Sequence, residues 1–191
     1  MPVVALVGYT NAGKSSLMRA LSGSDVYAAD EVFATLDPVT RRIGSGMSEA
    51  FLLTDTVGFM QKLPTQLISA FRATLEELRT ADLLLHVIDG TAPEIDAQRR
   101  TVEETLAALG LEETPVLTVV NKADGMVLPD GSPVETEADL AALAAANPLG
   151  IATETLYTSA TAGLGVDALR RRLLFEFYGA EVGQHTESAA V

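Results

Sequence analysis

A glycine-rich segment near the start of the chain carries the strongest chemical signal. Residues 8–15 read GYTNAGKS, which fits the pattern Gly-x-x-x-x-Gly-Lys-Ser/Thr of phosphate-binding loops. Its glycines allow backbone N–H groups to turn inward around phosphate oxygens, and a helix that begins there points the positive end of its dipole at the same anion. Lys14 is expected to reach the outer phosphates, and the Ser15 hydroxyl is expected to ligate Mg²⁺. The residues predicted to contact the nucleotide here are Gly8, Tyr9, Thr10, Asn11, Ala12, Gly13, Lys14, Ser15 and Ser16.

A second motif predicts which base is bound. Asn121, Lys122 and Asp124 follow a β-branched run over residues 114–120 that is typical of a buried strand. A carboxylate at Asp124 can accept hydrogen bonds from N1–H and the 2-amino group of guanine, whereas adenine would leave it unpaired. Asn121 can bond the base edge and tie its loop to the phosphate loop, and the apolar stem of Lys122 can cover one face of the base. The sequence therefore predicts a preference for guanine.

A third motif, DTVG at residues 55–58, ends the predicted strand 50–54. Asp55 is placed to hold Mg²⁺ through a water, and Gly58 to offer its N–H to the terminal phosphate. Hydrolysis would break that bond and release the segment that follows. Such a short motif is usually only a strand-end turn, but here it lies between the other two motifs in the required order.

Two weaker elements complete the set. Ser159 and Ala160 follow a predicted strand over 151–157, and the Ala160 N–H could donate to guanine O6. A threonine in the segment 31–42 should supply a second Mg²⁺ ligand; Thr35 and Thr40 are both candidates, and Thr35 is preferred because Thr40 can instead enter a strand. Five elements in this order predict a GTPase domain.

The expected catalytic residues are Lys14, Thr35 and Gly58. Many GTPases place a water-orienting glutamine directly after the third motif, but this chain has Phe59 there, and the nearby Gln61 is more simply a loop residue. We therefore expect slow intrinsic hydrolysis, with the Thr35 carbonyl as a candidate for positioning water. Asn11 could hold K⁺ between the inner and outer phosphates, or it could only tolerate a positive-φ turn.

Apolar runs and amphipathic stretches alternate along the chain, which predicts an α/β fold of the P-loop NTPase G-domain type. We expect a six-stranded, mostly parallel sheet with helices on both faces, and one antiparallel strand from a hairpin at 41–51. Amphipathic stripes predict helices over 65–79 and 166–177. Residues 91–94 fit a capping box for a further helix that Gly110 would end. All five motifs then fall at the carboxyl ends of strands, where such sheets bind ligands.

Length and composition favour one domain, residues 1–178, followed by a polar tail at 179–191 that we expect to be disordered. The 191 residues contain no cysteine, no apolar run of membrane-spanning length and no signal-peptide pattern, so a cytoplasmic location is expected. The net charge of −13 predicts weak independent binding to RNA. Three arginines at 170–172 fit the solvated face of a terminal helix better than a basic docking patch.

The residues that stand within and around these motifs resemble those of the HflX family of GTPases. The resemblance rests on the phosphate loop and on FATLDPVTRR at 33–42, DTVGF at 55–59, LP at 63–64, AFRATLEE at 70–77 and ADLLLHVID at 81–89. It covers about residues 2–178 and implies a cytosolic, Mg²⁺-dependent GTPase that acts on the large ribosomal subunit and on stalled ribosomes. HflX proteins carry an N-terminal domain that this sequence lacks, so we expect an excised domain. An Obg-type or tRNA-modification GTPase, or a nucleotide-dependent binding module with negligible turnover, remain as alternatives.

Overall fold

A six-stranded sheet forms the centre of the protein. The computed structural model describes residues 1–23, 39–44, 49–56, 58, 78–151 and 154–179. Within these ranges the strand order is β2-β3-β1-β4-β5-β6. The strands are β1 (Val3–Val7), β2 (Val39–Ile43), β3 (Phe51–Asp55), β4 (Leu83–Asp89), β5 (Val116–Asn121) and β6 (Thr155–Tyr157). Only β2 runs antiparallel to its neighbour, and it pairs with β3 as the predicted hairpin requires, so the predicted fold class is confirmed.

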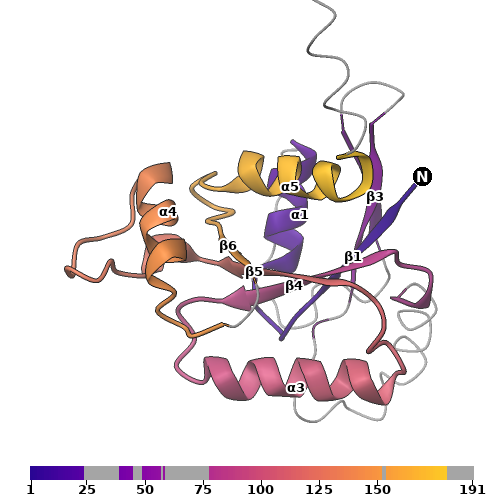
Figure 1. The fold of residues 1–191 in the computed structure, drawn as a ribbon, viewed down its shortest axis with the longest axis horizontal. Coiled ribbons are helices and arrows are strands. Elements are labelled where there is room, and N and C mark those ends of the chain that lie inside the picture. The colour runs from indigo at the N-terminus through magenta and orange to yellow at the C-terminus, as the bar shows by residue number, and fades with distance from the viewer. Residues whose placement is uncertain (24–38, 45–48, 57, 59–77, 152–153, 180–191) are drawn as a thin grey trace, which may run out of the picture.

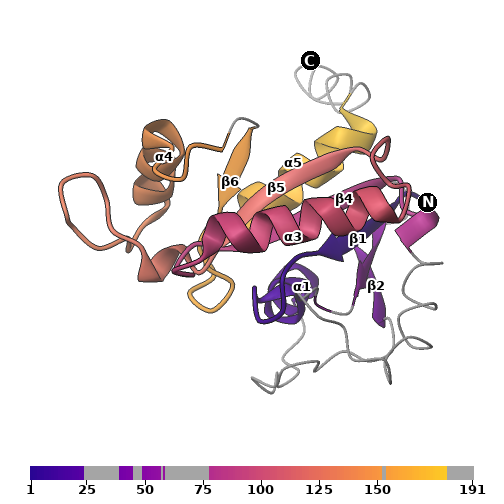
Figure 2. The same ribbon diagram turned by 90° about the horizontal axis from the view of Figure 1, so that it is seen from below.

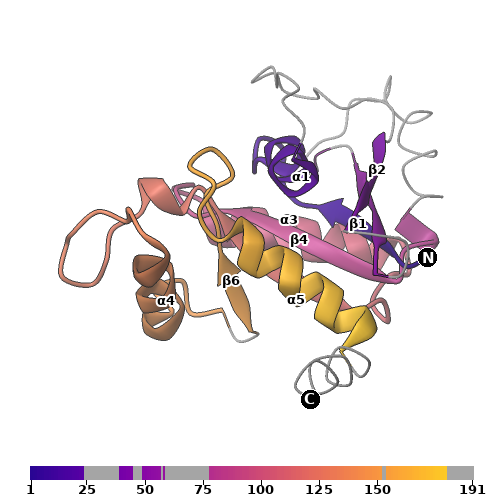
Figure 3. The same ribbon diagram turned by 90° about the horizontal axis from the view of Figure 1, so that it is seen from above.

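Helices cover both faces of this sheet. They are α1 (Lys14–Ser22), α3 (Ile95–Ala108), α4 (Glu137–Ala146) and α5 (Val166–Tyr178), with a short 3₁₀ helix, η2, at Ala123–Gly125. Figure 1 shows α1 and α5 on one face and α3 on the other, and Figure 3 shows α1 and α5 from above. Helix α4 lies beyond β6, at the end of the sheet opposite to β2 (Figure 2). The helix predicted over 65–79 lies outside the described residues except for Leu78 and Arg79, which are helical.

The core follows the alternation of side chains along the strands. In β4, Leu85 and Val87 pack in one cluster with Leu17 of α1 and Leu169 of α5, whereas Leu84 packs on the opposite face in a second cluster. The second cluster includes Val102 and Leu106 of α3, and a third, around α4, includes Ile88, Val120, Leu140, Leu143 and Tyr157. Because β4 and β5 are buried on both faces, the sequence shows them as nearly continuous apolar runs.

Two predictions about helix ends had different outcomes. Gly110 does end α3: it has φ 70°, its N–H bonds the Ala107 carbonyl, and the next N–H, of Leu111, bonds the Leu106 carbonyl. The capping box at residues 91–94 is wrong, because Glu94 is the N-cap of α3 without a side-chain cap bond and Thr91 bonds Asp89 instead. A capping box does exist at the start of α4, between Thr136 and Asp139.

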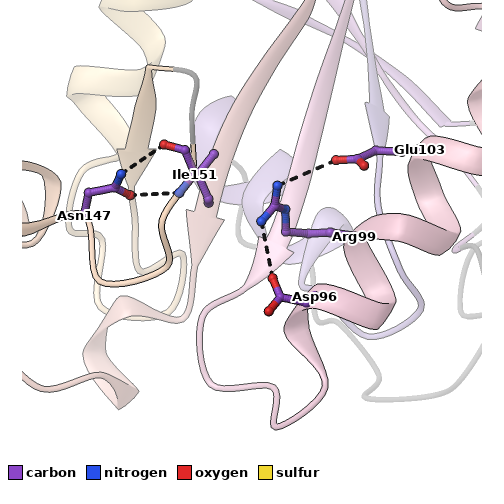
Figure 4. A network of polar contacts seen from close by, with 5 residues as sticks. All are labelled: Asp96, Arg99, Glu103, Asn147 and Ile151. Atoms are coloured by element: carbon purple, nitrogen blue, oxygen red, sulfur yellow. Dashed lines mark hydrogen bonds and ion pairs between the residues drawn. The ribbon is translucent and has the colours of Figure 1, made fainter.

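The strand predicted to begin at residue 151 begins at Thr155. Figure 4 shows the reason: the Asn147 side chain donates to the Ile151 carbonyl at 3.0 Å and accepts from its N–H at 3.1 Å. Both backbone groups of Ile151 are therefore bonded to a side chain and are not available for sheet pairing. The same view shows Arg99 of α3 with its carboxylate partners Asp96 and Glu103.

The arginines of α5 have polar partners on α1, near β6 and on α5 itself. Arg170 donates to the Leu21 carbonyl at 3.0 Å, at the end of α1, and also pairs with Asp167. Arg172 pairs with two carboxylates, Glu154 and Glu176. Two of the three arginines at 170–172 thus have acidic and carbonyl partners, which agrees with a helix face better than with a basic patch. Among the described residues, no helix is long and apolar enough to cross a membrane.

Candidate nucleotide site

Those predicted site residues that the structure describes gather at one edge of the sheet. Parallel strands β1, β3, β4, β5 and β6 end together there, with Leu6 opposite Asp55 and Asp89 opposite Asn121. Strand β1 lies between β3 and β4, so the loop that follows it occupies the point where the strand order reverses. Open α/β sheets bind their ligands at such a point.

The loop between β1 and α1 has the backbone shape of a phosphate loop. Gly8, Asn11 and Gly13 have φ values of 157°, 62° and 93°. A Cβ on Gly8 would lie 2.3 Å from the Val87 carbonyl oxygen, so only glycine fits between the loop and β4. Gly13 is the N-cap of α1, and the first turn of α1, which the structure describes in full, has no acidic residue. The helix dipole is therefore left to act on an anion in the loop.

Lys14 lies inside this loop. Its side chain is buried, and its Nζ donates to the carbonyls of Gly8 at 3.2 Å and Tyr9 at 3.3 Å. Burial lowers the pKa of Lys14 to about 8, although the nearby Asp55 carboxylate acts in the opposite direction. The ammonium is thus at the position where phosphate oxygens would have to enter.

The first and third motifs meet around Lys14. The Ser15 hydroxyl donates to Asp55 Oδ2 at 2.5 Å. A Cβ on Gly58 would lie 2.7 Å from Thr10 Cα and 3.0 Å from Lys14 Nζ, so the backbone of residue 58 passes directly over the phosphate loop. A hydroxyl beside one carboxylate is an oxygen donor set that fits Mg²⁺, which commonly uses one or two carboxylates together with substrate phosphates.

The two threonine candidates for the Mg²⁺ site have different outcomes. Thr35 lies outside the described residues, as do Phe59 and Gln61. Thr40 lies within β2, and its Oγ1 is 3.0 Å from Thr54 Oγ1 on β3. Thr40 is therefore a strand residue that pairs with β3, which agrees with the interpretation that it enters a strand and does not ligate Mg²⁺.

Asn121 joins three loops. It is 2% exposed; its Nδ2 donates to the Ala12 carbonyl at 3.2 Å, and its Oδ1 accepts from Thr158 Oγ1 at 3.3 Å and from the Ala160 N–H at 3.1 Å. The predicted tie to the phosphate loop is present. The Ala160 N–H, predicted to donate to guanine O6, donates here to Asn121.

Lys122 directly precedes η2, and Asp124 is the middle residue of η2. Lys122 has φ 61°, and its Nζ lies 2.8 Å from Asp89 Oδ2. A Cβ on Gly13 would be 4.0 Å from Lys122 Cε, so the stem of Lys122 runs over the phosphate loop. Asp124 is exposed, within η2. Ser159 is fully buried, and its hydroxyl accepts from the Ala162 N–H, so its side chain stabilises its own loop.

Two residues that hold this edge together, Asp89 and Thr56, were given no role of their own from the sequence. Asp89 accepts from the N–H and hydroxyl of Thr91 at 2.9 and 2.6 Å in addition to pairing with Lys122. Burial acts to raise the pKa of Asp89, but its hydrogen bonds to Lys122 and Thr91 outweigh this and hold the pKa below its ordinary value. Thr56 is buried, and its hydroxyl donates to the Leu6 carbonyl, which links the exit of β3 to β1. The signal for Asp89 was its place at a strand end on this edge.

Comparisons with known proteins agree with this geometry. A family model described as "50S ribosome-binding GTPase" matches residues 3–122, which is more than half of the chain. The GTPase HflX of Caldanaerobacter subterraneus subsp. tengcongensis is 53% identical over 133 residues, covering 69% of this chain and 31% of that protein. The GTPase HflX of Escherichia coli (strain K12) is 40% identical over 187 residues, covering 97% of this chain and 41% of that protein. The chain thus spans between about a third and two fifths of the length of these relatives.

Solved structures show the same fold. A GTP-binding protein from the archaeon Sulfolobus solfataricus, in complex with GDP, is similar with a TM-score of 0.60 and 26% identity, covering 90% of this chain and 51% of that one. A variant of Aquifex aeolicus Era bound to GDP and AlF₄⁻ has a TM-score of 0.67 at 24% identity, covering 91% and 56%, and supports the fold alone. The chain therefore belongs to the family of 50S ribosome-binding GTPases and is a GTPase domain of the HflX type.

Proposed function

We propose that this chain binds GTP and GDP together with Mg²⁺ and hydrolyses GTP, as the nucleotide switch of a protein that acts on the large ribosomal subunit. The observation that carries the proposal is the position of Asn121, whose side chain joins Ala12 of the phosphate loop to Ala160 of the last loop. A base-reading loop and a phosphate loop are thereby held at one edge of the sheet, where a nucleotide can span both.

In the proposed site each motif has one task. The backbone N–H groups of residues 8–16 surround the phosphates, and Lys14 exchanges its carbonyl partners for β- and γ-phosphate oxygens. The Ser15 hydroxyl, Thr35 and, through water, Asp55 would hold Mg²⁺, which when bound neutralises charge on the phosphate oxygens. Gly58 would donate its N–H to the γ-phosphate. Asp124 would read N1–H and the 2-amino group of guanine, Lys122 would cover one face of the base, and Ser159 would support the Ala160 loop.

For Ala160 to donate to guanine O6, its N–H must be shared with or released by Asn121 Oδ1. A shared, three-centre bond needs no movement of the loop, because Asn121 also retains its bond from Thr158. Guanine O6 can therefore be recognised while the tie between the loops persists.

Hydrolysis needs further positive charge or an oriented water. Asn11 is exposed at the tip of the phosphate loop with φ 62°, so its side chain can reach a cation such as K⁺ placed beside the phosphates. An added cation there would occupy the position that an arginine finger takes in other GTPases, where the finger contributes about 10³–10⁵ in rate.

The ribosomal partner is proposed from the family. The matching family model is described as ribosome-binding, and the chain spans 31% and 41% of two relatives named GTPase HflX. With a net charge of −13 we expect the domain of residues 1–178, with its tail at 179–191, to bind free RNA weakly and to act in the cytoplasm, where ribosomes are.

The test is phosphate release from GTP under multiple turnover, with Mg²⁺, in KCl and NaCl of matched ionic strength, with and without 50S subunits. Release that is faster in KCl supports a cation-assisted GTPase, and release only with 50S subunits means that the partner completes the site. Tight GTP binding without release in any condition would favour the binding module. Equal rates in both salts would remove the K⁺ role of Asn11.

A further inference from the structure

Asp89 lies beside the base-reading residues 121–124, and the sequence assigned it no role in the site. It ends β4 directly opposite Asn121 in the sheet. Its side chain is 15% exposed, and both of its oxygens are occupied: Oδ2 by the Lys122 ammonium at 2.8 Å and Oδ1 by the N–H and hydroxyl of Thr91. The bonds from Thr91 therefore orient the carboxylate independently of its contact with Lys122.

Lys122 depends on this contact for its orientation. Its backbone is in the left-handed region, φ 61°, and its side chain passes over Gly13 with Cε 4.0 Å from the Cβ position there. A lysine side chain has four rotatable bonds, and fixing them costs rotamer entropy. Because Asp89 holds the ammonium at the end of the Lys122 side chain, the apolar stem is ordered over the phosphate loop before a nucleotide binds.

The two segments also contact each other through the backbone. The Gly90 N–H donates to the Asn121 carbonyl at 2.9 Å. A Cβ on Gly125 would lie 2.6 Å from Thr91 Cγ2, so residues 89–91 pack directly against residues 121–125. These contacts fix the two segments against each other, so that Asp89 and Lys122 face each other at a set distance.

We propose that Asp89 is a positioning residue of the nucleotide site, which holds the Lys122 ammonium so that the lysine stem forms a preformed wall for the guanine nucleotide. The proposal rests on the proposed function. It requires that loss of the Asp89 charge speeds nucleotide release through Lys122 and leaves the choice of base, which depends on Asp124, unchanged.

The test measures the dissociation rate of a fluorescent GDP analogue from the chain carrying Asp89→Asn, a substitution that preserves shape. A partly buried charged hydrogen bond is weakened, so we expect dissociation to be roughly five- to twentyfold faster. The preference for GDP over xanthosine diphosphate should stay as in the wild type. Asp96→Asn is the matched control, because it makes the same charge change on the surface of α3, where the side chain is 79% exposed and pairs with Arg99 (Figure 4); it should leave the rate unchanged.

A double-mutant cycle separates positioning from general stability. In a Lys122→Ala background, Asp89→Asn should have no further effect on the dissociation rate; an equal effect in both backgrounds would overturn the proposal, as would a wild-type rate for the single variant. If Asp89→Asn does not fold, Thr91→Val removes one of the bonds that orient the carboxylate and should speed dissociation roughly two- to fivefold. Failure of the wild-type chain to bind any guanine nucleotide would instead refute the proposed function itself.

Discussion

The Asn121 side chain offers a direct test of how the three loops are held together. Asn121→Asp keeps the shape and keeps an oxygen to accept from Thr158 and Ala160. It replaces the Nδ2 donor, 3.2 Å from the Ala12 carbonyl oxygen, with a second oxygen. An attraction between donor and acceptor thus becomes a repulsion between two oxygens at a position that is only 2% exposed.

The expected loss of stability has two parts. The lost hydrogen bond is worth about 1 kcal/mol. The new carboxylate faces a carbonyl away from water, so its pKa rises, and each unit of the rise costs about 1.4 kcal/mol of folding free energy at neutral pH. We expect a total of about 3 kcal/mol at pH 7. Because the pKa of the new carboxylate is raised in the folded state, protonation restores a donor, and the deficit relative to wild type should shrink as the pH falls towards 5.

The assay is urea unfolding followed by far-ultraviolet circular dichroism at both pH values, with the difference from wild type as the measured quantity. Asn147→Asp is the matched control, since Asn147 also donates to a carbonyl and accepts from an N–H, those of Ile151, but on an exposed turn (Figure 4). It should cost less than about 1 kcal/mol. Equal losses for the two variants, or a deficit at Asn121 that grows on acidification, would refute the reasoning.

Three further outcomes follow from buried polar groups. Burial lowers the pKa of Lys14 to about 8, and bound phosphate should keep Lys14 charged, so GDP affinity should fall roughly fourfold from pH 7 to 8.5 by calorimetry; Lys14→Arg, which stays charged, should give a flat profile. Burial, with Arg99 and Lys14, lowers the pKa of His86 from 6.5 to about 4, so its contribution to stability is present above pH 6.5 and is lost as pH falls from 6.5 to 4. Between pH 7 and 5 the wild type should lose about 2 kcal/mol that His86→Gln does not lose, as measured by urea unfolding. The Tyr157 hydroxyl is buried without a hydrogen-bond partner among the described residues, so Tyr157→Phe should raise the melting temperature by a few degrees, whereas a fall would contradict this account.

Much of the fold was predictable because parallel strands buried on both faces appear as apolar runs, and polar motifs mark their carboxyl ends. Helix α4 was not predicted. Six of its ten residues are alanine, a residue that favours helix but carries no clear apolar period. The start of β6 was also misplaced. The Asn147 side chain bonds both the N–H and the carbonyl of Ile151, and the local sequence pattern does not indicate such a contact.

The sequence indicated which motifs form the candidate site, but it did not indicate which side chains hold these motifs in place. Asn121 and Lys122 were proposed as site residues from the spacing of their motif alone. The partner of Lys122 could not be identified, since the pairing with Asp89 depends on the register of β4 against β5. Similarly, the bond from Ala160 to Asn121 depends on how β6 sits beside β5, which the sequence does not specify.

The contacts around the site divide its residues into two kinds. Lys14 and Ser15 already have partners inside the protein, the carbonyls of Gly8 and Tyr9 and the carboxylate of Asp55. Binding of a nucleotide with Mg²⁺ would exchange these bonds for bonds to phosphate and metal, so these side chains contribute to affinity only by the difference between the old and new partners. Asn121 bonds Ala12 and Thr158, partners that we do not expect a nucleotide to displace, so we expect it to contribute to stability as well as to affinity. Substitutions at the first kind of residue should change affinity more than folding, and substitutions at the second kind should change both.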